Sequence, residues 1–134
     1  MYTQPENPLT RPRSHAAARD AGTKLERDAA EYLTQSLGDE IVRRQRTGKD
    51  RGDLHGLHFH GHRLVVEAKN VAKMNLPAWI REAEVERGND DALAGLVLHK
   101  RHGNGNPADQ WVTMTLGELV ALITLNRDHY KGGP

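Results

Sequence analysis

Residues 53–70, DLHGLHFHGHRLVVEAKN, decide how the chain is expected to fold. The stretch predicts two strands joined by a turn near Gly61-His62, and the second strand, residues 63–69, carries the Leu-Val-Val run of a half-buried or central strand. Side chains alternate between the two faces of a strand, so Glu67 and Lys69 project to the same side. A carboxylate and an ammonium group at the end of an apolar strand are costly to bury alone, so each needs a partner.

The partner that the sequence offers is Asp53, at the start of the preceding strand. A hairpin that turns near residues 61–62 places Asp53 beside residues 67–69, so two carboxylates and one lysine converge at one end of the sheet. Hard oxygen ligands of this kind suit Mg²⁺ or Mn²⁺, and the Ala68 carbonyl is a further candidate ligand. Lys69 is expected to orient or activate an attacking water, or to stabilise negative charge in a transition state.

A helix is expected over residues 18–37, where apolar residues recur at helical spacing and Gly38 provides a C-terminal stop. Glu26 lies at the edge of its apolar stripe. If this helix packs on the sheet, Glu26 reaches the same metal site, where it binds a second metal or holds a metal-bound water. The alternative is an ion pair with a nearby lysine or arginine, and the sequence leaves both interpretations open.

The remaining segments alternate between strand and helix patterns. They are a short strand at 40–45, a helix at 76–88, strands at 93–98 and 111–114, and a last helix that Thr115 and Glu118 begin as a capping box. This order predicts an α/β fold in which helices flank a mixed β-sheet. We expect a single domain over residues 18–130, preceded by a flexible N-terminal arm of residues 1–17.

Composition narrows the classes of protein to consider. A length of 134 residues suits one compact domain, and the absence of cysteine excludes disulfides, thiolate zinc sites and cysteine nucleophiles. There is no apolar run of membrane-spanning length and no apolar signal-peptide core, so a cytoplasmic or intracellular protein is expected. The formal net charge is only +1, so binding to a polyanion requires a local basic surface.

The ordered motifs resemble those of a known enzyme group. The string GD-x₁₃-EAK, from Gly52-Asp53 to Glu67-Ala68-Lys69, is similar to the PD-(D/E)xK nuclease superfamily, with Gly52 where proline often stands. The chain looks most like the archaeal-type Holliday-junction resolvases and their phage relatives. The supporting strings are GTKLER at 22–27, VRR at 42–44, GDL at 52–54 and VVEAKN at 65–70, and the resemblance covers about residues 22–100.

The resemblance implies a restriction-endonuclease-like core and hydrolysis of DNA phosphodiesters with Mg²⁺ or Mn²⁺. The site residues carried over are Glu26, Asp53, Glu67 and Lys69, with Asp53, Glu67, Glu26 and the Ala68 carbonyl as metal ligands. Branched DNA is the implied substrate, and a homodimer is the implied assembly because two sites would cut two strands. The helix around Leu119–Leu125 is a candidate dimer surface, with core packing as its alternative.

Basic residues are expected to contact the phosphates of the DNA backbone, which a nuclease must neutralise. The denser stretch comprises Arg43, Arg44, Arg46, Lys49 and Arg51, and a second patch comprises Lys100 and Arg101. A solvated loop is the alternative for the denser stretch. His55, His58, His60 and His62 invite a zinc interpretation, but Gly61 breaks their register, so we expect solvated hairpin histidines.

Two other functions remain open on the sequence. One keeps the enzyme class and changes the substrate to linear DNA, as in a restriction, repair or end-processing nuclease. The other is a non-catalytic DNA-binding module that retains the fold. The second predicts DNA affinity without metal-dependent turnover, and it gives no reason for carboxylates beside phosphate.

Overall fold

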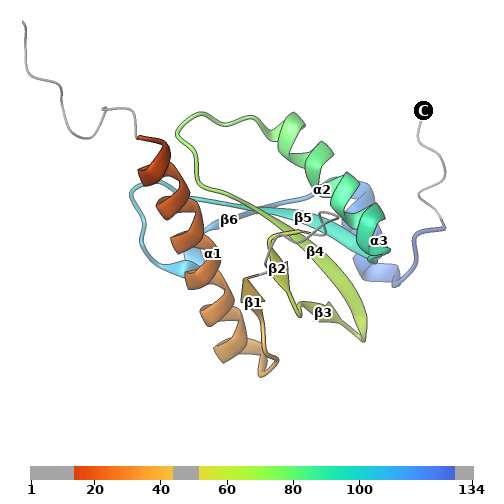
Figure 1. Ribbon diagram of the computed structural model, residues 1–134. Helices are drawn as coiled ribbons and strands as arrows, with labels where there is room; N and C mark the ends of the chain where they lie inside the picture. The colour runs from red at the N-terminus through yellow and green to blue at the C-terminus, as the bar shows by residue number, and fades with distance from the viewer. Residues whose placement is uncertain (1–13, 44–51, 129–134) are drawn as a thin grey trace, which may run out of the picture.

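The structure is a computed structural model that describes residues 14–43 and 52–128 (Figure 1). Its elements in chain order are α1 (His15–Leu37), β1 (Val42–Arg43), β2 (Leu54–His55), β3 (His58–Phe59), β4 (His62–Lys69), α2 (Leu76–Asp90), β5 (Ala94–His99), a 3₁₀ turn η1 (Pro107–Asp109), β6 (Trp111–Thr113) and α3 (Leu116–Thr124). The chain is therefore a mixed α/β protein, as the sequence predicted.

The main sheet has the strand order β3-β4-β5-β6. β4 and β5 run parallel, with Glu67 opposite Val97 and Lys69 opposite His99. β3 and β6 pair antiparallel with β4 and β5, so the sheet is mixed. β1 and β2 form a separate antiparallel pair.

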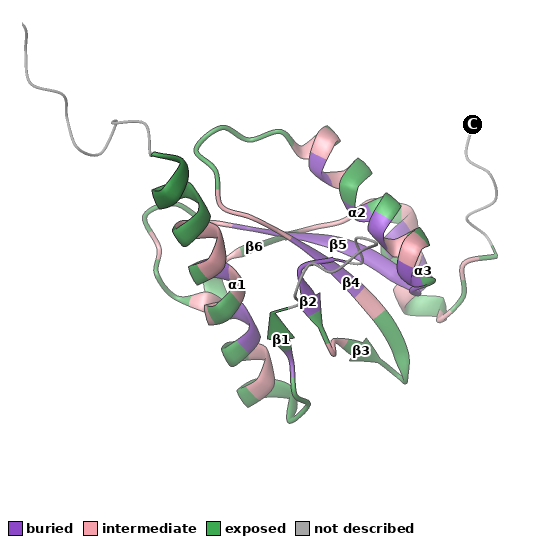
Figure 2. Cartoon of the chain, in the orientation of Figure 1, coloured by how far each residue is buried: buried purple, intermediate pink, exposed green. Residues whose placement is uncertain are grey.

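Helices cover both faces of this sheet. On one face Val66 and Leu98 pack into a core cluster with Leu25 of α1, and on the other Val97 packs with Trp79 of α2. Because neighbouring residues of a strand face opposite sides, the α2 face also receives Glu67 and Lys69. Figure 2 shows that the central strands are the most buried part of the sheet.

The hairpin differs in part from the prediction. Its turn falls at His60-Gly61, both with positive φ, and β4 begins at His62, one residue earlier than expected. The first strand is broken at Gly56, which has a φ of 104°, and a Cβ there would collide with the Glu40 carbonyl oxygen. The chain before Gly56 therefore pairs with β1, and the chain after it pairs with β4.

Several element boundaries also shift. α1 begins at His15, three residues before the predicted start, because the Ser14 side chain caps it by accepting from the Ala17 N–H at 3.1 Å. The predicted arm therefore loses its last residues to the helix, and residues 1–13 lie outside the described part of the chain. The stop at Gly38 is confirmed by its left-handed φ of 78° and its N–H bond to the Thr34 carbonyl.

The C-terminal half follows the predicted order closely. α2 extends two residues beyond the predicted end, and β5 starts and ends one residue later than predicted. Thr115 caps α3 by accepting from the Glu118 N–H, as expected. Of the helices in residues 14–43 and 52–128, none has the length and apolar character needed to cross a bilayer.

Candidate active site

The end of β4 carries the charged pair that the sequence singles out. Glu67 is buried with 2% of its surface exposed, on the face of the sheet that α2 covers. The Lys69 Nζ atom lies 3.3 Å from the Glu67 Oε1 atom and 2.6 Å from the Glu82 Oε2 atom of α2. The lysine is thus held between a strand carboxylate and a helix carboxylate.

Asp53 lies beside this pair, as the hairpin pattern predicted. The Asp53 N–H donates to the Val66 carbonyl at 2.8 Å, and the Asp53 Oδ2 atom accepts from the Ala68 N–H at 2.7 Å. Gly52 permits the approach, because a Cβ on it would lie 3.1 Å from a Val65 methyl group and its φ is 97°. The backbone of β4 therefore fixes the Asp53 carboxylate next to Glu67.

Burial makes the ionised form of Glu67 costly. The pKa of Glu67 is raised from 4.5 to about 7, chiefly by loss of water. The negative charge of Asp53 and a hydrogen bond with Glu82 add to this rise, while a hydrogen bond with Glu86 and the charge of Lys69 act against it. The Glu67 Oε2 atom is buried without a hydrogen-bond partner among the described residues. A cation at this atom would satisfy it and favour the charged carboxylate.

Lys69 is held in its charged form. Burial by itself lowers the pKa of Lys69, but the hydrogen bond with Glu82 and the charges of Glu67 and Glu82 outweigh it, so the pKa is raised above 10.5. The side chain is therefore a hydrogen-bond donor and a positive charge at physiological pH.

Sequence reasoning missed the part that α2 plays. The glutamates of this helix are not among the predicted site residues, yet Glu86 is 3% exposed and Glu82 contacts Lys69. The missed signal is the spacing of positions 79, 83, 86 and 90, which form the buried stripe of α2 with Glu86 in its middle.

The four-residue metal set is assembled only in part. Among the described residues, no group of three or more histidine, aspartate or glutamate side chains lies close enough to hold a metal ion. Glu26 forms an ion pair with Arg43 at 2.5 Å, the arrangement that the sequence left as its alternative. Asp53 and Glu67 remain together, and two carboxylates with water and phosphate oxygens form a common Mg²⁺ site. The buried, unsatisfied Glu67 Oε2 atom fits such a site.

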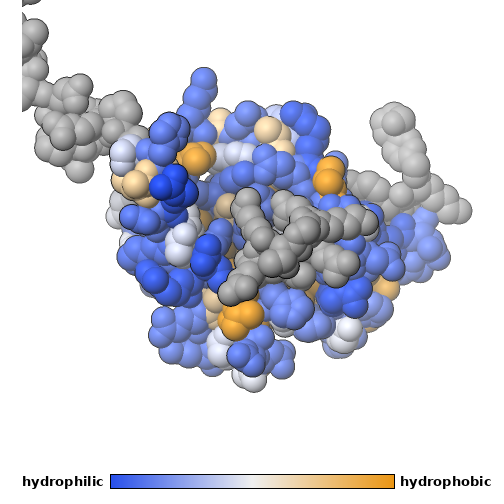
Figure 3. All heavy atoms as spheres, viewed as in Figure 1, coloured by the Kyte–Doolittle hydropathy of each residue, from blue (hydrophilic) through white to orange (hydrophobic). Residues whose placement is uncertain are grey.

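Of the seven residues predicted to contact phosphate, the structure describes three. Arg43 pairs with Glu26, Lys100 donates to the Asn104 carbonyl, and the Arg101 guanidinium lies 4.6 Å from the centre of the Trp111 ring. The other predicted contacts lie outside the described residues: Arg44, Arg46, Lys49 and Arg51. On the face in Figure 3, hydrophobic residues are isolated among hydrophilic ones.

The histidine cluster is solvated, as expected. His55, His58, His60 and His62 are all exposed. None belongs to a metal-holding group in the described chain. His58 Nδ1 lies 2.7 Å from the Gly56 carbonyl oxygen, within the hairpin itself.

Comparisons of the chain with protein-family models, with curated proteins and with solved structures find no match. The basis for a function is therefore the set of residues at the end of β4 and their geometry.

Proposed function

We propose that this chain is a metal-dependent endodeoxyribonuclease with a restriction-endonuclease-like core, which hydrolyses phosphodiesters in branched DNA. The observation that carries the proposal is the position of the Asp53 carboxylate. It accepts a hydrogen bond of 2.7 Å from the N–H of Ala68, the residue between Glu67 and Lys69. Two carboxylates and a lysine thereby meet at one end of one strand. A structural ion pair requires only one of these carboxylates.

Asp53 and Glu67 would hold Mg²⁺ or Mn²⁺, with the Ala68 carbonyl as a third oxygen ligand. The bound ion supplies Lewis acidity toward a phosphate oxygen and lowers the pKa of a coordinated water. The protein fixes the Asp53 carboxylate through the β4 backbone, so little reorganisation accompanies binding.

Lys69 acts as a charged donor in this proposal. Its raised pKa favours orientation of the water and stabilisation of charge on the phosphate in the transition state over a role as general base. Glu82 holds the ammonium group at 2.6 Å and so positions it beside Glu67.

Glu26 is a supporting residue in this proposal. A direct role at the metal requires its carboxylate to exchange the Arg43 guanidinium for the ion or its water. In the paired state Glu26 instead orients Arg43 on β1, the first residue of the basic stretch proposed to contact DNA phosphates.

The proposal is tested with a panel of DNA substrates. Purified protein is incubated with a four-way junction, linear duplex and single-stranded DNA of matched sequence, with Mg²⁺, Mn²⁺ or EDTA. Metal-dependent cuts in the junction, with slower cutting of the duplex, are expected. Faster cutting of linear DNA would contradict branched DNA as the substrate and would favour linear DNA. DNA binding with no cleavage in either metal would favour a non-catalytic binding module.

A further inference from the structure

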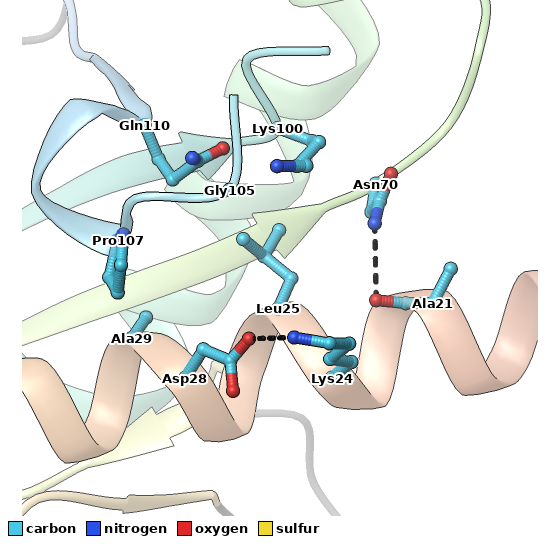
Figure 4. A pocket seen from close by; sticks show the side chains of 10 residues that line it. All are labelled: Ala21, Lys24, Leu25, Asp28, Ala29, Asn70, Lys100, Gly105, Pro107 and Gln110. Atoms are coloured by element: carbon cyan, nitrogen blue, oxygen red, sulfur yellow. Dashed lines mark hydrogen bonds and ion pairs between the residues drawn. The ribbon is translucent and has the colours of Figure 1, made fainter. Parts of the chain in front are cut away.

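A cleft of about 250 Å³ lies between α1 and the loop that follows β5 (Figure 4). Its floor is apolar and is formed by Leu25 and Ala29 of α1, with Pro107 of the loop facing them. Charged groups surround this floor, namely Lys24, Asp28 and Lys100. Lys24 is paired with Asp28, and the Lys100 ammonium donates to the Asn104 carbonyl, so the rim above the apolar floor carries one net positive charge.

The loop wall of this cleft is fixed by its own hydrogen bonds. The Gln110 amide nitrogen donates to the Asn104 and Asn106 carbonyls at 3.0 and 2.8 Å. The Gln110 amide oxygen accepts from the Arg101 N–H at 2.7 Å. A wall held in this way is preformed, so a ligand would not have to order it.

The cleft adjoins the end of β4 from the α1 side of the sheet, whereas Glu67 and Lys69 face α2. Asn70, the residue after Lys69, lines it and donates to the Ala21 carbonyl of α1 at 3.1 Å. Lys100 lines the other side, and its N–H donates to the Lys69 carbonyl at 3.0 Å. Asp53 is held at this same end of β4 through the Ala68 N–H, so a DNA strand bound at Asp53 would have the cleft beside it on the α1 side.

The size and lining of the cleft suit a small, mostly apolar group with an anionic attachment. The space is too small for a duplex and too apolar at its floor for a phosphate alone, and Lys24 and Lys100 lie at its rim. We propose that this cleft receives one unpaired nucleobase of the substrate strand next to the scissile phosphate. This inference rests on the proposed nuclease function. Branched DNA supplies such a base at a lower cost than a continuous duplex does.

Filling the cleft tests the inference. Ala21 lines the cleft and is half-buried, so Ala21→Phe occupies it, whereas Ala16→Phe adds the same ring at an exposed position of the same helix that does not line the cleft. Binding without divalent metal is measured by fluorescence anisotropy for a duplex with one unpaired base, its fully paired counterpart, and a duplex with an abasic residue at the unpaired position.

The wild type is expected to bind the unpaired-base duplex about tenfold more tightly than the other two, because stacking and polar contacts to one base change affinity by about this factor. Ala21→Phe should lose this preference and Ala16→Phe should retain it. Asp28→Asn, which removes the rim anion at an accessible side chain, should increase affinity for the unpaired-base duplex.

A wild type without the preference, or an Ala21→Phe variant that folds and keeps it, would overturn the inference. Weaker binding by Asp28→Asn would also count against it. Junction cleavage by the wild type in Mg²⁺ is read separately. A chain that cleaves DNA without a base preference overturns this inference alone, and a chain that neither binds nor cleaves DNA overturns the proposed function as well.

Discussion

At the scale of single residues, Lys69 links the strand chemistry to the helix that covers it. Its ammonium group lies between Glu67 and Glu82, and its raised pKa keeps it charged. Lys69→Met preserves most of the side-chain volume and removes the charge. We expect the cleavage rate to fall by about 10²–10³-fold, the usual cost of removing one transition-state donor. Single-turnover cleavage at saturating enzyme measures this, and an unchanged rate would assign Lys69 a purely structural role.

Glu67 should also make the stability of the metal-free protein depend on pH. The pKa of Glu67 is about 7 in the fold and 4.5 in its absence, so the unfolded chain releases this proton first as pH rises. The stability that the neutral carboxyl contributes is full below pH 4.5 and is lost as pH rises from 4.5 to 7.

The loss is on the order of 3 kcal/mol. Denaturant unfolding in EDTA should therefore show that the free energy of unfolding of the wild type decreases between pH 4.5 and 7, relative to that of Glu67→Gln, which cannot ionise. Parallel pH profiles of the two proteins would contradict the raised pKa.

Residue patterns in the sequence predicted the strand part of the site and not its helix part. Strand alternation placed Glu67 and Lys69 on one face, and the hairpin brought Asp53 to them. Whether a helix residue is buried depends on which face of the helix packs against the sheet. Three glutamates at alternate positions of α2 gave no reason to place Glu86 inside, because burying a carboxylate is normally unfavourable.

At the scale of elements, Gly56 separates β2 from β3 and so decides which strand each part of the chain joins. Its φ is 104° and a Cβ would meet the Glu40 carbonyl, so Gly56→Ala should destabilise the fold by about 1–3 kcal/mol. Gly88→Ala, within α2 and with open space around it, should stabilise by about 1 kcal/mol. Thermal unfolding of both variants checks the opposite signs. A neutral Gly56→Ala would show that the chain tolerates another backbone path there.

Element order and type were predictable, whereas strand lengths were not. The 3.6-residue periodicity identified α1, and a cap identified the start of α3. The first hairpin strand was predicted as continuous because its His and Leu residues alternate. The break at Gly56 arises from contact with the Glu40 backbone, which is distant along the sequence and is brought close by packing.

At the scale of the whole molecule, α3 presents an apolar outer face. Leu116 and Ile123 are 76% and 72% exposed and lie seven residues apart, so they share one side of the helix. The homodimer expected from the resemblance would cover this face. We therefore expect a dimer by light scattering after size exclusion, and a monomer for Ile123→Glu.

Val85→Glu is the matched control, since Val85 of α2 is also exposed and lies on another helix. A wild type that is monomeric at high micromolar concentration would contradict the dimer. Dissociation by both variants would show that the effect is not specific to α3, and it would not support α3 as the interface.

The proposed nuclease requires a divalent metal held by Asp53 and Glu67. The most decisive experiment is the Mg²⁺-dependent cleavage rate of a four-way junction by the wild type, Asp53→Ala and Glu67→Ala, with the exposed Asp39→Ala as the control. We expect the first two substitutions to abolish cleavage and Asp39→Ala to leave the rate within about twofold, as for a surface substitution. Cleavage that persists at the wild-type rate in Asp53→Ala or Glu67→Ala would contradict the proposed metal site.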